Sequence, residues 1–115
     1  MEIRGHQYTA AQGIATVSNT TPVEIIAGVT GKTLYLNYIS ISISDAVAGS
    51  CELTDGSGGT AFWKQELITT GLSGPTSYML DYGEYGLALT EGNGLWVESS
   101  ATGLDVTVTA LGYYK

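Results

Sequence analysis

The side chains best suited to catalysis are few and scattered along the chain. One cysteine, Cys51, and one histidine, His6, nearly exclude a metal site built from these ligands. A Ser–His–Asp triad needs a firmly held imidazole, whereas His6 lies in a weakly patterned segment. Five carboxylates could pair for acid–base work, but the sequence favours no two of them: Glu52, Glu66, Asp81, Glu84 and Glu98. We therefore expect no enzymatic activity, no cofactor and no metal.

Aromatic side chains offer binding rather than catalysis. The chain has eight Tyr, two Trp and one Phe, and Trp63 and Trp96 could stack on a sugar ring or anchor a partner. Trp96 alternates out of phase with Leu95 and Val97. In one interpretation Trp96 points outward as a sugar-stacking platform. In the other it faces the core, and Leu95 and Val97 face a neighbouring subunit. The sequence favours burial against a subunit over glycan binding.

Cys51 has no partner for an internal disulfide and no basic neighbour in sequence that would lower its pKa. A small buried apolar residue is the expectation for it.

Charge and composition exclude several partners. Eleven acidic residues against four basic ones give a net charge of −7. A chain this acidic lacks the positive footprint that nucleic acids require, and an anionic membrane surface would repel it. No segment approaches the ~20 apolar residues of a membrane span, and the N-terminus lacks the apolar run of a signal peptide. We therefore expect no nucleic acid and no membrane as partners.

The elements that must position these residues are short strands. Sixteen glycines and only 13% charged residues favour strands joined by Gly-rich turns over a helical bundle. Turn signals such as DGSGG and EGNG separate short strands that are spaced roughly 8–12 residues apart. The sequence predicts an all-β, single-domain, jelly-roll-like β-sandwich of about eight strands. Residues 14–115 would form this domain, and residues 1–13 an extended N-terminal arm.

The longest uninterrupted strand signal, residues 32–44, changes phase midway. Leu34, Leu36 and Tyr38 share one face, and then isoleucines 39, 41 and 43 occupy the other. Because a slip of one residue turns every side chain to the opposite face, a regular strand cannot send both sets to one core. Either a β-bulge lies near residues 37–39, or the strand is buried on both faces and meets a partner subunit.

Two segments resemble a known family. The closing segment, YGLALTEGNGLWVESSATGLDVTVTALGYYK, has the strand, Gly-containing turn and final Val/Thr strand that end many structural proteins of tailed bacteriophages. The segment VEIIAG followed by VTGKTLYLNYISISIS resembles their central strand. The resemblance is to small jelly-roll virion proteins, namely capsid decoration (cement) proteins and head or tail fibre proteins.

The resemblance implies a non-enzymatic virion protein, made in a bacterial host cytoplasm and located on a capsid surface. Its partners would be copies of itself, as a homotrimer, and the major capsid protein. The alternatives are a fibre, neck or tail domain that binds a receptor, and a carbohydrate-binding module. The residues expected at subunit or capsid contacts are Ile3, Tyr8, Leu34, Leu36, Tyr38, Leu95, Val97, Leu111 and Tyr113.

Overall fold

The computed structural model describes residues 8–43, 48–67 and 76–115, and every regular element in these ranges is a β-strand. The prediction of an all-β sandwich is confirmed. No helix capable of crossing a membrane occurs in the described part of the chain. The nine strands are β1 (Thr9–Val17), β2 (Val23–Ile26), β3 (Leu34–Ile43), β4 (Gly49–Asp55), β5 (Thr60–Leu67), β6 (Thr76–Asp81), β7 (Leu87–Ala88), β8 (Leu95–Ser99) and β9 (Val106–Tyr114).

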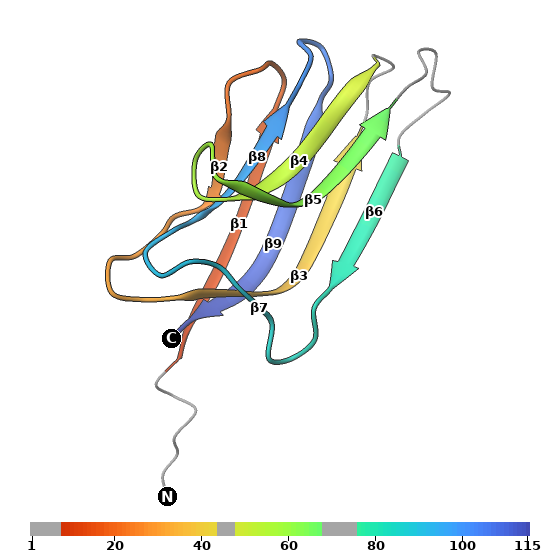
Figure 1. Cartoon of the computed structure of the whole chain (residues 1–115). Helices are drawn as coiled ribbons and strands as arrows, with labels where there is room; N and C mark the ends of the chain where they lie inside the picture. Colours follow the sequence, from red (N-terminus) through yellow and green to blue (C-terminus); the bar gives the residue numbers. More distant parts are fainter. Residues whose placement is uncertain (1–7, 44–47, 68–75) are drawn as a thin grey trace, which may run out of the picture.

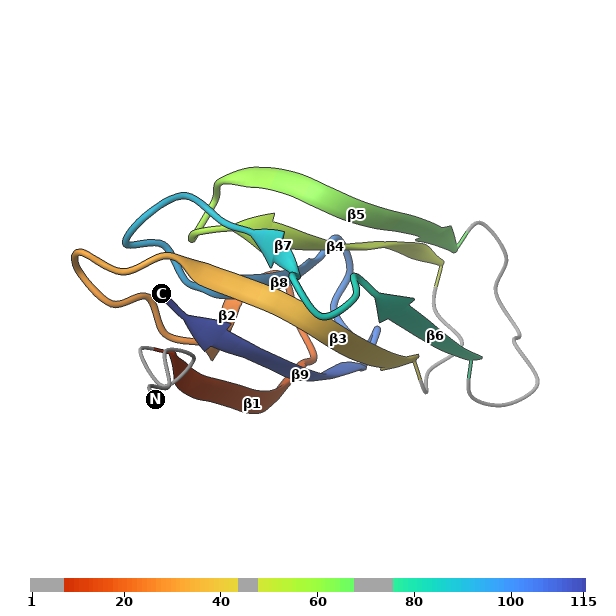
Figure 2. The ribbon, with the colours of Figure 1, turned by 90° about the horizontal axis from the view of Figure 1, so that it is seen from below.

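The strands form two antiparallel sheets that pack face to face (Figures 1 and 2). Sheet A has the order β1-β9-β3-β6, with the two-residue β7 beside β3, and sheet B has the order β2-β8-β4-β5. If β7 is set aside, the first strand pairs with the last, the second with the last but one, and so on inward. This nested pairing is the jelly-roll arrangement of a double sheet.

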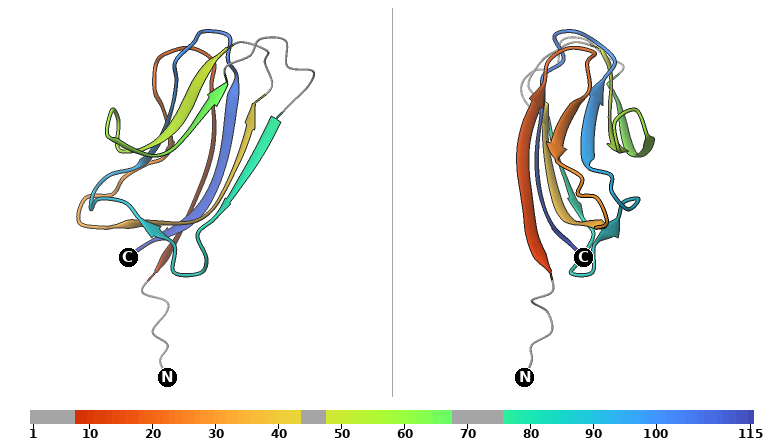
Figure 3. Two further views of the ribbon diagram at one scale, coloured as in Figure 1. Left: turned by 45° about the vertical axis from the view of Figure 1, so that its right-hand side comes forward. Right: turned by 90° about the vertical axis from the view of Figure 1, so that its left-hand side faces the viewer.

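Alternation along the strands builds the core between the sheets. Buried and outward-facing residues alternate along β8, along residues 106–111 of β9, and along β3 except at residues 37 and 38. Figure 3 shows the two layers edge-on. The largest fully buried side chains are aliphatic residues from both sheets and one loop: Val17, Leu34, Leu36, Ile39, Ile41, Ile43, Leu53, Leu95, Val97, Leu104, Val106 and Val108.

A bulge in β3 explains the phase change seen in the sequence. The register of β3 against β9 shifts between Leu36 and Tyr38, which leaves Asn37 as the extra residue. Leu34 and Leu36 therefore point to the same side as Ile39 and are fully buried in the core. The bulge alternative is correct. The prediction that Leu34 and Leu36 line a subunit contact is wrong, because the bulge turns them inward.

Two close contacts hold the bulge. The Asn37 side-chain amide donates hydrogen bonds to the carbonyl oxygens of Gly83 (2.9 Å) and Glu84 (3.1 Å), in the turn after β6. On β9, a Cβ atom at Gly112 would lie 2.1 Å from the Tyr35 carbonyl oxygen. Only glycine therefore allows the two backbones to approach this closely.

The first strand begins earlier than the sequence predicts. β1 starts at Thr9, and Thr9 to Gly13 pair with β9, so these residues belong to the sandwich rather than to an arm. The inward positions of this half-strand are small because β2 crosses closely above them. A Cβ atom at Gly13 would lie 2.0 Å from the Ile25 carbonyl oxygen. Residues 1–7 of the predicted arm, including Ile3 and His6, lie outside the described residues.

Aromatic side chains close one side of the sandwich, between the edge strands β5 and β6. Phe62 contacts Tyr82 edge-to-face, with ring centroids 6.3 Å apart, and Trp63 contacts Tyr78 in the same way at 5.6 Å. Both indole and phenyl rings pack against the core. Trp63 thus has a structural role that accounts for its position.

Candidate functional site

The outer face of sheet A is almost free of charge. The described strands of sheet A, β1, β3, β6, β7 and β9, contain a single charged residue. It is Asp81, at the end of the edge strand β6. The remaining outward positions of these strands are mainly Thr, Ser, Gln and apolar residues. In a chain with a net charge of −7, such a face is suited to contact with another surface rather than to facing solvent alone.

Apolar side chains gather on this outer face in two rows across the strands. One row joins Ile14, Thr109, Ser40 and Met79, and the next contains Leu111 and Tyr38. The exposed fractions are 69% for Ile14, 57% for Met79, 46% for Leu111 and 38% for Tyr38. Of the seven large apolar side chains exposed in the described residues, six lie on this face or at its end: Tyr8, Ile14, Tyr38, Met79, Tyr85 and Leu111.

Three tyrosine rings stack at the end of this face near the C-terminus. Tyr113 lies between Tyr8 and Tyr35, with ring centroids 4.9 and 5.0 Å away. The Tyr113 hydroxyl donates to the Tyr85 carbonyl oxygen at 2.7 Å, and burial raises its pKa above the ordinary value of 10.0. The Lys115 ammonium lies 5.5 Å from the centre of the Tyr8 ring. Both faces of Tyr113 are therefore occupied within the chain.

Two hollows open on the same side of the molecule. One, of about 300 Å³, lies between β1 and β9 and is lined by Gln12, Gly13, Ile14, Thr109, Ala110 and Leu111. The other, of about 390 Å³, lies beside the tyrosine stack and is lined by Tyr8, Ala10, Asn37, Glu84, Tyr85, Gly112 and Tyr113. Neither contains the convergent acid, base and nucleophile of a catalytic site.

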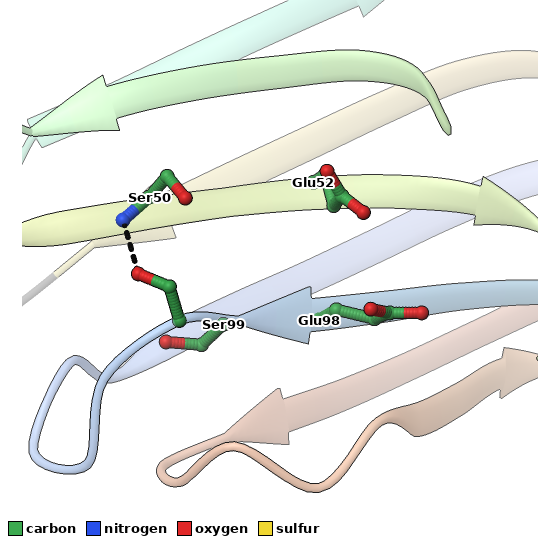
Figure 4. A pocket seen from close by; sticks show the side chains of 5 residues that line it. Ser50, Glu52, Glu98 and Ser99 are labelled. Atoms are coloured by element: carbon green, nitrogen blue, oxygen red, sulfur yellow. Dashed lines mark hydrogen bonds between the residues drawn. The ribbon is translucent and has the colours of Figure 1, made fainter. Parts of the chain in front are cut away.

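The outer face of sheet B is acidic. The outward positions of its strands carry four carboxylates and one ammonium: Glu24, Glu52, Lys64, Glu66 and Glu98. Glu52 on β4 and Glu98 on β8 are direct cross-strand partners and lie side by side in a shallow pocket of about 150 Å³ (Figure 4). Like charges placed directly opposite on a sheet destabilise it. Lys64, on β5, is opposite Glu52 and also lies 3.4 Å from Glu66.

The remaining polar residues of this pocket form hydrogen bonds within the chain. The other residues that line it, Ser50, Ser99 and Ser100, are held by bonds within the chain: the Ser100 hydroxyl accepts from the Ser50 N–H at 2.8 Å. Ser99 is buried, and its hydroxyl donates to the Ala101 carbonyl oxygen at 3.1 Å. Among the described residues, no group of three His, Cys, Asp or Glu side chains could hold a metal ion.

The structure settles the orientation of β8. Leu95 and Val97 are buried in the core, and Trp96 lies on the acidic outer face, partly exposed, between Glu24 on β2 and Thr54 on β4. The expectation that Leu95 and Val97 face a neighbouring subunit is wrong. These residues pack against sheet A in the core instead, because burying the aliphatic side of β8 between the two sheets stabilises the sandwich.

Cys51 lies on the inner side of β4 and is fully buried. Burial, with a smaller contribution from the neighbouring Glu52 carboxylate, raises the pKa of its thiol to about 11. A thiol in this environment is a poor nucleophile, because only the thiolate reacts.

Of the residues predicted at contacts, Tyr8, Tyr38, Leu111 and Tyr113 lie together on the outer side of sheet A. Sequence reasoning missed Ile14 and Met79, the two most exposed aliphatic side chains there. The sequence does not show which residues of β1 face inward, because those residues are small. It also does not show that β6 lies at the edge of the sheet. Once the inward set of each strand is known, both are apolar residues in the outward phase.

No family model and no curated protein sequence matches the chain. A chain from the acidic stable capsid of Helicobacter pylori bacteriophage KHP30 has a similar structure, with a TM-score of 0.58, 11% identity, and coverage of 93% of this chain and 88% of that one. The capsid of cyanophage Pam1 gives a TM-score of 0.48, with 11% identity over 93% and 84% of the two chains. A carbohydrate-binding module of Cellvibrio mixtus lichenase 5A, in complex with cellotriose, gives 0.42, with 14% identity over 87% and 70%.

The first of these similarities extends over nearly the whole of both chains, so the two are of comparable length. At 11% identity it concerns the fold. The chain is thus a jelly-roll β-sandwich with the fold of a phage capsid chain.

Proposed function

We propose that the chain is a non-enzymatic virion structural protein that decorates and stabilises a phage capsid surface as a homotrimeric cement protein. The observation that carries this proposal is the whole-chain similarity of fold to a chain of a phage capsid. The separation of chemistry between the two outer faces supports it, because a shell protein needs one surface for contacts and another for solvent.

The proposed mechanism is mechanical. A cement protein stabilises a shell by adding buried interface between capsomers, and attachment at several points multiplies weak contacts. Contacts would be made by Tyr8, Tyr38, Leu111 and Tyr113, with Ile3 in the segment that precedes Tyr8. The acidic face of sheet B would face solvent, since a protein lining the genome would be basic.

The copy number of the chain in purified particles from its source tests this proposal. Quantitative mass spectrometry, with isotope-labelled peptides of this chain and of the major capsid protein, gives the ratio directly. Decoration of the shell predicts a ratio near or just below one. A handful of copies per particle would move the chain to a fibre, neck or tail position. Its absence from particles would contradict the virion role.

A stability measurement complements the count. Particles assembled without the chain should lose their genome at a lower temperature than complete particles, and adding the purified chain back should restore the original temperature. A matched addition of heat-denatured chain controls for non-specific effects. Equal temperatures for all three samples would contradict a cementing role even if the copy number were high.

Glycan binding is a second candidate, favoured by one observation. Trp96 lies partly exposed on the outer face of sheet B, with the hydroxyls and carboxylates of Ser50, Glu52 and Glu98 on the same side of the sheet. A glycan array followed by a tryptophan-fluorescence titration tests this, with Trp96→Ala as the variant that should lose the signal. Trp63 is a poorer candidate, because its ring packs on Tyr78.

A further inference from the structure

Like-charge repulsion limits how copies of this chain can meet. Each copy has a net charge of −7, and the outer face of sheet B concentrates carboxylates. Two copies that met through that face would bring Glu24, Glu52 and Glu98 of each into apposition, with desolvation added to repulsion. The outer face of sheet A removes this obstacle, because Asp81 is its charged strand residue and lies at the edge.

The flat area of this face is close to that of the smallest specific contacts. Four strands spaced ~4.8 Å apart, each ~20–30 Å long, give roughly 500 Å² before side-chain relief is counted. A standard interface buries ~800 Å² per partner, and the smallest specific ones about 600 Å². The face also contains four well-exposed apolar side chains, Ile14, Tyr38, Met79 and Leu111, near its centre and both edges.

The two edges of the face differ in shape. Met79 projects from the edge strand β6, with 57% of its surface exposed. At the opposite edge, the hollow of about 300 Å³ between β1 and β9 is walled by Gln12, Ile14, Thr109 and Leu111. A flexible thioether side chain adapts well to such an irregular apolar hollow. A projection at one edge and a hollow at the other complement each other when two copies meet through this face, because the projection of each copy then lies at the hollow of the other.

We infer that copies of this chain bind one another through the outer face of sheet A, with Met79 of one copy seated in the hollow beside Ile14 of the next. This inference rests on the proposed function for its biological setting, but its physical content is independent. The partner is a second copy, because two copies of this acidic chain repel each other least when they meet through a face that is almost free of charge.

The first test is the mass of the purified chain in solution. Light scattering after size-exclusion chromatography, at protein concentrations from about 1 to 100 µM, should give a closed oligomer. Since an uncharged face carries the contact, raising the salt from about 50 to 500 mM should strengthen association by screening the net charge. A monomer at every concentration and salt, or an oligomer that salt dissociates, would overturn the inference.

A pair of matched variants locates the contact. Leu111→Lys places a charge in the centre of the face while reducing the net negative charge of the chain, so any loss of association cannot come from added long-range repulsion. We expect the dissociation constant to rise at least about tenfold. Val29→Lys is the control, because Val29 is the exposed large apolar residue away from this face, in the loop between β2 and β3. An equal effect of both variants, or none of Leu111→Lys, would overturn the assignment. Circular dichroism must show that both remain folded.

Cysteine cross-linking tests the position of Met79. Residues 14 and 79 lie in one row but three strand spacings apart, ~14 Å, which is too far for a disulfide within one chain. The double variant Met79→Cys, Ile14→Cys should therefore form covalent oligomers on mild oxidation. Each single variant should remain uncross-linked, and the buried Cys51 should not interfere. Cross-linking of either single variant alone, or none in the double variant, would overturn the Met79–Ile14 contact.

The outcomes separate this inference from the proposed function. A covalent trimer that is absent from particles would keep the contact and contradict the virion role. A chain that is abundant on particles but monomeric in solution and uncross-linked on the shell would keep the virion role and overturn the contact. A covalent dimer would keep the contact and contradict the trimer.

Discussion

The outer faces of the two sheets are built from the same pleated strands and yet are chemically opposite. Sheet A presents Thr, Ser and exposed apolar side chains with one strand carboxylate, Asp81, whereas sheet B presents four carboxylates and one lysine in fewer residues. Neither pattern is needed to form a sandwich, because the fold requires only the inward set of each strand. The difference is the basis of the contact proposed for sheet A, because carboxylates are costly to remove from solvent and a neutral face is not.

The largest effect on stability is expected when a charge is placed on the inner side of sheet A instead of its outer side. Leu36 is fully buried and Leu111, on the neighbouring strand, is exposed, although both were predicted at a subunit contact. Leu36→Asp buries a carboxylate without a partner, so we expect complete loss of the folded state. Leu36→Ala should cost about 2–5 kcal/mol.

Leu111→Asp is the control on the outer side of the same sheet and should leave a folded β-type protein. Far-ultraviolet circular dichroism and thermal melting measure both variants. A folded Leu36→Asp variant would mean that this residue faces a neighbour after all.

The neutral face depends on the bulge at Asn37, and Gly112 is its most sensitive point. In Gly112→Ala the new Cβ would lie 2.1 Å from the Tyr35 carbonyl oxygen, so β3 and β9 must separate. We expect a loss of about 2–4 kcal/mol of unfolding free energy, as for other overpacked or strained sites. Urea denaturation measures it.

Asn37→Ala removes two hydrogen bonds and is the milder companion, with a loss of about 1–2 kcal/mol. If Gly112→Ala were as stable as the natural chain, the close approach of the two strands would be contradicted.

These sites show how far sequence reasoning reaches. Period-two alternation predicted the strands and the sandwich, because burial of one face imposes it directly. The alternation of β3 could not choose between a bulge and an interface, since the choice depends on hydrogen bonds from Asn37 to residues 83 and 84, far along the chain. The start of β1 was missed because the backbone of β2 above Gly13 leaves room only for small inward residues.

The third prediction concerns the inner side of sheet B, beneath its acidic face. Burial raises the pKa of the Cys51 thiol from 9.0 to about 11, so the folded state holds this proton more tightly than the unfolded state. Unfolding free energy is unaffected below pH 9 and falls as the pH rises toward 11, by up to about 2–3 kcal/mol.

Urea denaturation at pH 8 and at pH 10.5 measures this fall. Partly buried tyrosines with raised pKa values, such as Tyr114, lower stability in the same pH range. Cys51→Ala separates the two contributions, because its stability should decline less steeply with pH. Equal slopes for the two proteins would contradict a buried thiol at this position.

The smallest effect tests the acidic face itself. Glu98→Lys places an ammonium directly opposite Glu52 in place of a second carboxylate, on strands that are otherwise unchanged. We expect a gain of about 0.5–1 kcal/mol, since a repulsive cross-strand pair becomes an attractive one. The gain should shrink in high salt, because the pair faces solvent. Glu98→Gln, which removes the repulsion without adding attraction, should give about half the gain.

The acidic face is not expected to carry the contact between copies. The Glu98→Lys variant should therefore self-associate no more tightly than the Val29→Lys control, in which the net charge also becomes less negative, by one unit instead of two. A loss of stability in Glu98→Lys would instead mean that Glu98 has a favourable partner that outweighs its repulsion from Glu52.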